Sequence, residues 1–260
     1  GNLSGGAKKR LSETSRWTID CALSQTLPRD SEGFRSTVRV RLMHAFIRGS
    51  LRQRPDWRFE DWGDPIMQLD MVATQLEFST IFMAGCAAQG LVYDRAEREA
   101  IMHYYRYICW LMGVNEDLQP RTFREGLEMM AMLYATSDMQ PDADSVALTR
   151  GLFAATREIM AEQEGGEWFK VLMGYRAAAL SRLMLSDRVA DFMEVPKAPF
   201  KLSLFAGSAA IFTADKLLGL TATTRAWRDR LGHELFQQAL KPENRGFIPT
   251  IAGRAVVSDL

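Results

Sequence analysis

The chain has 260 residues, and its 32 lysine and arginine side chains balance its 32 aspartate and glutamate side chains. A formal charge of zero gives the chain no general attraction to nucleic acid or to an anionic membrane, and we expect no nucleic-acid partner. An apolar content of 47% is that of an ordinary globular domain. Three cysteines, without a Cys-x-x-Cys pair, argue against a disulfide scaffold or a zinc finger.

The longest stretch without a charged residue covers residues 78–93. This stretch is shorter than the roughly 18 to 20 residues that span a bilayer, so we expect no transmembrane helix. The opening Gly-Asn-Leu-Ser-Gly-Gly is typical of a truncated flexible segment. We therefore expect a cytoplasmic protein that lacks some N-terminal residues, and a targeting signal lost with those residues would leave no trace.

Apolar residues recur every three or four positions and never alternate for long, which predicts an all-α fold. About eight main helices are expected in chain order, at 34–54, 66–88, 94–113, 122–135, 146–163, 167–187, 201–218 and 223–239. The segment 66–88 is apolar on nearly every side and is expected to be the buried central helix. No repeat or linker divides the chain, so we predict a single domain over residues 1–260.

Several polar residues stand where helix caps are expected. Asp94 precedes a helix with acidic residues in its first turns, and Gly113 follows its end. Thr122 and Glu125 have the spacing of a capping box. Ser145 is expected to start the next helix.

Motifs for nucleophilic catalysis and for phosphate binding are absent, because the chain has no Gly-x-Ser-x-Gly, Gly-x-Gly-x-x-Gly or Gly-Lys-Ser/Thr sequence. Hydrolase and nucleotide-binding functions are therefore disfavoured. In a helical protein without cysteine clusters, the histidines are the main candidates to hold a transition metal or haem. The chain has three, His44, His103 and His233.

His44 lies in an apolar helical stretch, with Arg41 one turn before it and Arg48 one turn after it. One interpretation is a histidine at the edge of a core. The other is an axial ligand to haem iron, with an arginine available for a propionate. Apolar residues that would line the haem are Val40, Met43 and Ile47. Spacing alone leaves both interpretations open.

The other two histidines are predicted to have structural or surface roles. His103 has aromatic neighbours and Arg106 three residues later, so we expect a packed, hydrogen-bonded interior side chain. His233 lies among charged residues, and we expect it at the surface.

Three motifs follow one another along the chain. They are Arg41-Leu-Met-His44-Ala, Trp62-Gly-Asp-Pro-Ile-Met-Gln68-Leu-Asp70 and Glu99-Ala-Ile-Met-His103-Tyr-Tyr-Arg106-Tyr-Ile-Cys-Trp-Leu-Met-Gly113-Val. This series resembles the catalytic domain shared by latex clearing protein, a rubber oxygenase, and the fungal oxygenase of mycophenolic acid biosynthesis. The resemblance covers residues 10 to about 190.

The resemblance implies a globin-like helical core that holds a b-type haem. In that family the histidine of an Arg-x-x-His motif is the proximal iron ligand, which maps to His44, with Arg41 beside it. Met43 and Ile47 would then contact the haem. The family cleaves carbon–carbon double bonds of isoprenoid chains with dioxygen, so the expected partners are dioxygen and an apolar isoprenoid-like substrate.

Rubber-cleaving members also have an upstream Arg-x-x-Lys-Thr motif on the distal side of the haem. The corresponding stretch is Arg10-Leu-Ser-Glu13-Thr14, in which Glu13 replaces the lysine. We predict that Glu13 is the distal acid or base, with Arg10 and Thr14 beside it, and that polyisoprene is a doubtful substrate. The alternative is the start of an N-terminal helix, with Ser12 or Thr14 as its cap and Glu13 solvated in the first turn.

Two other functions stay open from the sequence. One is a cofactor-free helical binding or structural protein of the same fold. The other is an oxygenase that uses non-haem iron or copper, which the scattered histidines favour less, because no helix carries the spacing of a two-histidine-one-carboxylate site. The colour of the purified protein separates a haem enzyme from a cofactor-free protein.

Overall fold

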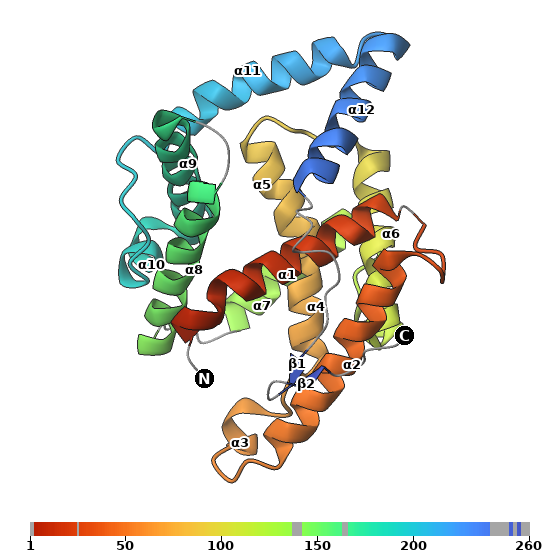
Figure 1. Ribbon diagram of the computed structural model, residues 1–260, viewed down its shortest axis with the longest axis vertical. Coiled ribbons are helices and arrows are strands. Elements are labelled where there is room, and N and C mark those ends of the chain that lie inside the picture. The colour runs from red at the N-terminus through yellow and green to blue at the C-terminus, as the bar shows by residue number, and fades with distance from the viewer. Residues whose placement is uncertain are drawn as a thin grey trace. The chain divides into compact units, whose positions relative to one another are not determined.

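The computed structural model describes residues 3–24, 26–136, 142–162, 166–239, 250–251 and 254–255. These residues are helical almost throughout, as Figure 1 shows. Apart from the loops between helices, the described residues include one antiparallel pair of two-residue strands, β1 (Thr250–Ile251) and β2 (Arg254–Ala255). The predicted all-α fold class is confirmed, whereas the globin-like arrangement stays a prediction.

The chain divides into two compact units, each built from separate stretches of sequence. Unit 1 contains residues 1–15, 84–92 and 138–232. Unit 2 contains residues 16–83, 93–137 and 233–260. This division does not test the prediction of a single domain over the whole chain.

Unit 2 is built mainly from helices of the first half of the chain. They are α1 (Leu3–Leu23, from Arg16 onward), α2 (Glu32–Arg52), α3 (Phe59–Trp62), α4 (Gln68–Leu76), the π-helical turn η1 (Glu77–Ile81), the first residues of α5 (Phe82–Ala88), α6 (Arg95–Met112), the 3₁₀ turn η2 (Glu116–Leu118) and α7 (Phe123–Thr136). Helices α4, α6 and α7 pack on one another around buried Val72, Leu76, Met102 and Met130. The predicted helices of this region therefore form.

The predicted central helix runs without interruption from Gln68 to Ala88, through α4, η1 and α5. It begins after Ile66, whose φ of 52° does not suit a right-handed helix. Among the described residues it is the one helix that is long and apolar enough to cross a membrane, a criterion that core helices of soluble proteins also meet. Val72 and Leu76 are fully buried, but Leu69 and Phe82 are about half exposed, so the expectation of burial on every face is only partly met.

The second half of α1 is tied to α2 by a chain of hydrogen bonds. The indole of Trp17 donates to the Thr37 hydroxyl at 3.0 Å, and that hydroxyl donates to the Gly33 carbonyl at 2.7 Å. A Cβ atom on Gly33 would lie 2.8 Å from the Asp20 carbonyl oxygen. Glycine at this position therefore allows the two helices to approach closely.

The caps predicted for α6 are confirmed. The Asp94 carboxylate accepts a hydrogen bond from the Glu97 amide at 2.8 Å, and the Glu97 carboxylate accepts from the Asp94 amide at 2.7 Å. At the other end, Gly113 has a φ of 93°, in the left-handed region that ends helices.

Two other predicted caps need correction. The Thr122 hydroxyl accepts from the Glu125 amide at 3.2 Å, but the Glu125 carboxylate accepts from the amide one residue before Thr122, so the reciprocal bond of a capping box is missing. Ser145 does not start α8 (Ala143–Glu162). Asp142 does, because its carboxylate accepts from the Ser145 amide at 2.8 Å.

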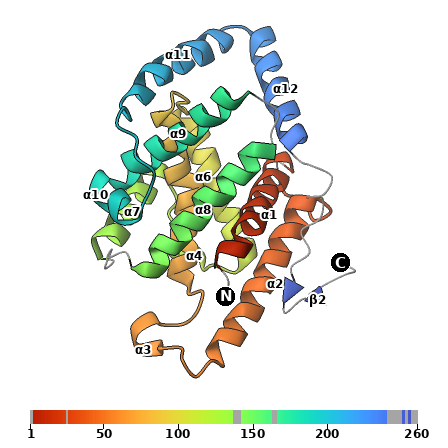
Figure 2. The ribbon, with the colours of Figure 1, turned by 60° about the vertical axis from the view of Figure 1, so that its left-hand side comes forward.

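Unit 1 is built mainly from helices of the second half of the chain. They are α8, α9 (Glu167–Leu185), α10 (Asp187–Phe192), α11 (Ser203–Leu218) and α12 (Ala222–Ala239, as far as Gly232). Helix α9 packs against α8, α10 and α11, and Figure 2 shows α10 beside the C-terminal end of α9. Small buried residues at these contacts, including Ala178, Ala179 and Ala190, let the helices come close together.

Buried Arg182 fastens α9 to the segment that follows it. Its guanidinium donates to the carbonyls of Val195 and Pro196 at 2.7 and 2.8 Å, and to the carboxylates of Asp187 and Asp191 at 3.3 and 2.6 Å. A buried arginine with this many partners cannot be removed without leaving polar groups unsatisfied.

We expect Arg182→Met to lower the free energy of unfolding by about 3 kcal/mol, because two carbonyls lose their side-chain donor and two carboxylates lose one of their two cationic partners. Arg188→Met, which changes an exposed arginine in the next helix, is the control and is expected to change it by less than about 0.5 kcal/mol. Urea unfolding followed by circular dichroism measures both. Equal effects would contradict the role given to Arg182.

Two helical glycines in unit 2 are expected to respond oppositely to substitution by alanine. A Cβ on Gly126 of α7 would lie 2.4 Å from the Thr80 hydroxyl oxygen, whereas a Cβ on Gly49 of α2 would meet nothing within 4 Å. Gly126→Ala should lower the free energy of unfolding by about 1 to 3 kcal/mol through overpacking. Gly49→Ala should raise it by up to about 1 kcal/mol through helix propensity, and thermal denaturation tests the difference in sign.

Candidate functional site

His44 lies in the middle of α2 and is half-buried. Its Nδ1 atom is enclosed and has no hydrogen-bond partner among the described residues. Burial lowers the pKa of His44, and the positive charge of Arg48 lowers it further. The ring is therefore neutral at physiological pH and keeps a lone pair for a metal.

Two arginines on either side of His44 hold neighbouring segments in place. Arg48 donates to the carbonyls of Pro65 and Ile66 at 3.2 and 2.6 Å. Arg41 donates to the Leu111 carbonyl at 2.9 Å, at the C-terminal end of α6. Both arginines thus already bind backbone carbonyls, and they anchor α2 next to His44.

The apolar residues predicted around His44 lie on the same helix. Val40, Met43 and Ile47 are each half-buried. Val40 packs on a buried cluster that contains Trp17 of α1 together with Ile108 and Leu111 of α6. The helix therefore presents a half-buried imidazole between apolar side chains.

These observations are compatible with an axial haem ligand and with a histidine at the edge of the core. An unpartnered buried polar atom costs about 1 to 3 kcal/mol, and this cost for Nδ1 is the same whether or not Nε2 binds iron. The enclosed Nδ1 leaves the Nε2 side as the accessible part of the ring. A neutral imidazole in apolar surroundings is what haem iron requires.

No group of three or more histidine, cysteine, aspartate or glutamate side chains within the described ranges could hold a metal ion. A site built from several protein ligands therefore finds no support in the part of the chain that the structure covers. A single histidine would be sufficient to hold haem, because the porphyrin nitrogens supply the other iron ligands.

The predicted distal residues Arg10, Glu13 and Thr14 all lie on α1 and belong to unit 1, whereas His44 belongs to unit 2. The Glu13 carboxylate lies 3.6 Å from the Lys9 ammonium. Because α1 begins at Leu3, these residues lie in the interior of the helix. The alternative of a helix start capped by Ser12 or Thr14, with Glu13 in the first turn, is wrong.

The prediction for His103 is also wrong. Its side chain is exposed, and its neighbour Met102 occupies the buried face of α6. Arg106 lies deeper, with an enclosed Nε atom that has no partner among the described residues. His233 is exposed, as predicted.

Sequence reasoning missed the π-helical turn within the central helix, although such turns are frequent at functional sites. Glu77 begins this turn and is the one acidic residue among residues 71–93. Desolvation by its surroundings raises the pKa of Glu77. The residue types carry no signal for a π-helical turn, so its position could not have been predicted.

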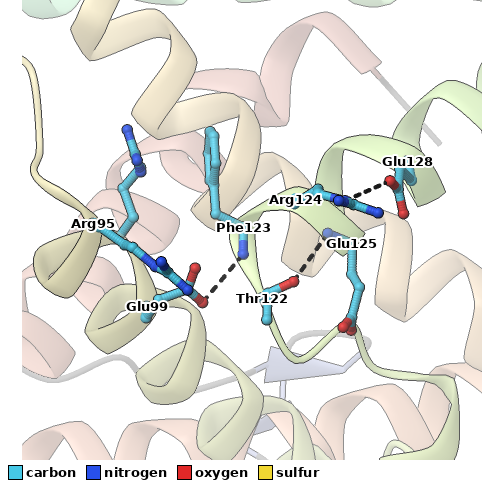
Figure 3. A pocket seen from close by; sticks show the side chains of 8 residues that line it. Arg95, Glu99, Thr122, Phe123, Arg124, Glu125 and Glu128 are labelled. Carbon is cyan, nitrogen blue, oxygen red and sulfur yellow. Dashed lines mark hydrogen bonds and ion pairs between the residues drawn. The ribbon is translucent and has the colours of Figure 1, made fainter.

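Two surface hollows lie in unit 2, and neither contains His44. The larger, of about 420 Å³, lies between the first turns of α6 and α7 (Figure 3). There the Phe123 amide donates to the Glu99 carboxylate at 3.3 Å, and the Arg98 guanidinium lies 5.2 Å from the Phe123 ring centre. Most side chains that line this hollow are arginines and glutamates, which do not suit an apolar substrate.

Comparison with known proteins identifies the family to which the chain belongs. Residues 2–214 match the family described as "ER-bound oxygenase mpaB/B'/Rubber oxygenase, catalytic domain", and the chain belongs to this family. The resemblance predicted from the three motifs is confirmed. Membership of an oxygenase family supports an enzyme.

One curated relative is the rubber oxygenase of Streptomyces sp. (strain K30). It is 27% identical over 215 residues, which cover 81% of this chain and 50% of the relative. The chain thus spans about half the length of the curated relative it matches. No solved structure matches the chain.

Proposed function

We propose that this chain is the catalytic domain of an oxygenase that binds haem b through His44 and cleaves a carbon–carbon double bond of an apolar, isoprenoid-like substrate with dioxygen. The observation that carries the proposal is the half-buried imidazole of His44 on α2, whose pKa is lowered by burial, so that the neutral form that binds iron is favoured. Family membership supports the oxygenase class. The haem, when bound, supplies the iron at which dioxygen is activated.

The reaction balances without any other reductant. The four-electron oxidation of a double bond to two carbonyl groups matches the four-electron reduction of dioxygen, and each oxygen atom ends in one carbonyl. No hydride or electron donor is needed, which agrees with the absence of a Gly-x-Gly-x-x-Gly dinucleotide motif.

The residues around His44 would position the cofactor. Arg41 and Arg48 fix α2 against neighbouring backbone, and Met43 and Ile47 provide apolar contacts beside the ring. Apolar walls exclude water, which protects reactive oxygen species from side reactions.

Glu13 is proposed as the distal acid or base, with Arg10 and Thr14 on the same helix. It lies one turn before Trp17 in α1, on the same face of that helix. Its carboxylate would accept a proton from the carbon next to the double bond and return it once the bond is cleaved, or, in its protonated form, would donate a hydrogen bond to oxygen. The relative's name indicates rubber as its substrate, but Glu13 stands where rubber-cleaving members have lysine, so we propose a different unsaturated isoprenoid.

Labelled dioxygen tests this function. Haem-loaded protein is incubated with squalene and ¹⁸O₂, products are trapped at once with borohydride, and cis-1,4-polyisoprene is assayed in parallel. We expect one dioxygen consumed per bond cleaved, and label in both resulting alcohols. If haem-loaded protein cleaves neither compound, or if label enters only one product, the proposed reaction is wrong.

A further inference from the structure

Helix α11 has two very different faces. Leu204 and Ser208 form the buried face, and the Ser208 hydroxyl donates to the Ala88 carbonyl at 2.6 Å within unit 1. Elsewhere on α11, Phe205 and Leu217 are 48% and 59% exposed, and Leu202, directly before the helix, is 65% exposed. A helix this apolar is normally covered on all sides, whereas these side chains of α11 are not covered by the described residues.

The apolar face continues beyond α11 into the bend and the first turns of α12, which Figures 1 and 2 show joined to α11 at a sharp angle. Leu220 is 72% and Trp227 52% exposed. We call this surface the α11–α12 face; its exposed apolar members are Leu202, Phe205, Phe212, Leu217, Leu220, Trp227 and Leu231.

The charge balance of the whole chain hides a local excess of positive charge on this segment. Residues 200–231 contain five basic residues and two acidic ones. Both acidic residues, Asp215 and Asp229, are held by one arginine, Arg228, at 3.0 and 3.1 Å. Lys201 is paired with Asp187, and among the described residues Lys216, Arg225 and Arg230 have no carboxylate partner.

We propose that the α11–α12 face docks on the surface of an anionic lipid bilayer. Exposed leucine and aromatic side chains beside unpaired lysine and arginine are the features with which interfacial helices bind such surfaces. Trp227 and the Lys216 ammonium, 5.5 Å from the Phe212 ring centre, suit the headgroup level. A second copy of this chain would bring like charges together, so charge complementarity favours lipid.

Vesicle sedimentation with the full chain tests the proposal without any turnover, so its outcome does not depend on the proposed oxygenase function. The probes are vesicles of phosphatidylcholine alone and with a quarter phosphatidylserine. Wild-type protein should bind the anionic vesicles more tightly, and less so at high salt. Phe205→Ser with Leu217→Ser should weaken binding about tenfold or more.

Two further variants complete the design. Lys216→Glu with Arg230→Glu should remove the preference for anionic vesicles. Leu148→Ser with Leu152→Ser, on α8, has similar exposure and should bind like wild type. Circular dichroism checks that each variant is folded, and the charge-reversal pair keeps the proposal testable if the apolar pair does not fold.

Three results would overturn the proposal. The first is wild-type protein that does not sediment with anionic vesicles, and the second is an equal loss of binding in the α11 and α8 variants. The third is a wild-type dimer in analytical ultracentrifugation that the α11 substitutions dissociate while vesicle binding is absent, which would assign the face to a second copy.

Discussion

His44→Ala is expected to give a folded protein that no longer retains haem. The substitution removes the one predicted iron ligand and leaves only apolar contacts to hold the porphyrin, so haem retention should fall by at least about 100-fold. Absorption spectra of wild-type and variant protein, each expressed with supplied haem and then passed over a desalting column, measure the loss. Added imidazole should partly restore the wild-type spectrum by entering the space left by the ring.

His103→Ala is the matched control, because His103 is an exposed histidine on a neighbouring helix of the same unit. It should change neither the spectrum nor the stability. A wild-type spectrum in His44→Ala, or loss of the spectrum in His103→Ala, would show that His44 is not the iron ligand.

Glu13→Gln is expected to reduce turnover about 100-fold while haem stays bound, because the amide keeps the size of the carboxylate but cannot exchange its proton. The dependence of turnover on pH should change as well. Steady-state oxygen consumption across a pH series with haem-loaded protein measures both effects.

Glu158→Gln is the control for that substitution, since Glu158 is an exposed glutamate within α8. It should leave turnover and the pH profile unchanged. If Glu13→Gln behaves in the same way, Glu13 has no catalytic part, even where His44 proves to hold the haem.

Helix positions were largely predictable because each long helix has a clear apolar period and defined ends. Asp94 and Gly113 mark the two ends of α6 through local hydrogen bonding and a left-handed backbone, both of which depend on residue type alone. Ser145 misled the prediction because Asp142, three residues earlier, offers a competing cap for the same amide.

Burial was less predictable than helicity. His103 follows Met102 directly, and a rotation of about 100° per residue places one of them inside and the other outside. The local sequence, apolar on several sides, does not determine which residue is buried. The packing of α4 and α7 against α6 determines it.

Part of the site was visible from the sequence and part was not. His44, Met43 and Ile47 share one helix, so their proximity followed from spacing. The hydrogen bonds of Arg41 to Leu111 and of Arg48 to Ile66 join residues 70 and 18 positions apart, and no spacing rule predicts such contacts. One arginine beside His44 was expected to be available for a propionate, but Arg41 and Arg48 both donate to backbone carbonyls.

The amount of haem that the purified protein holds tests the central claim most directly. The chain is expressed with supplied haem, and the bound porphyrin and iron are quantified by the pyridine haemochrome method and by elemental analysis. We predict one haem and one iron per chain, with a Soret band that is lost in His44→Ala. A colourless wild-type protein, or iron bound without porphyrin, would contradict the account.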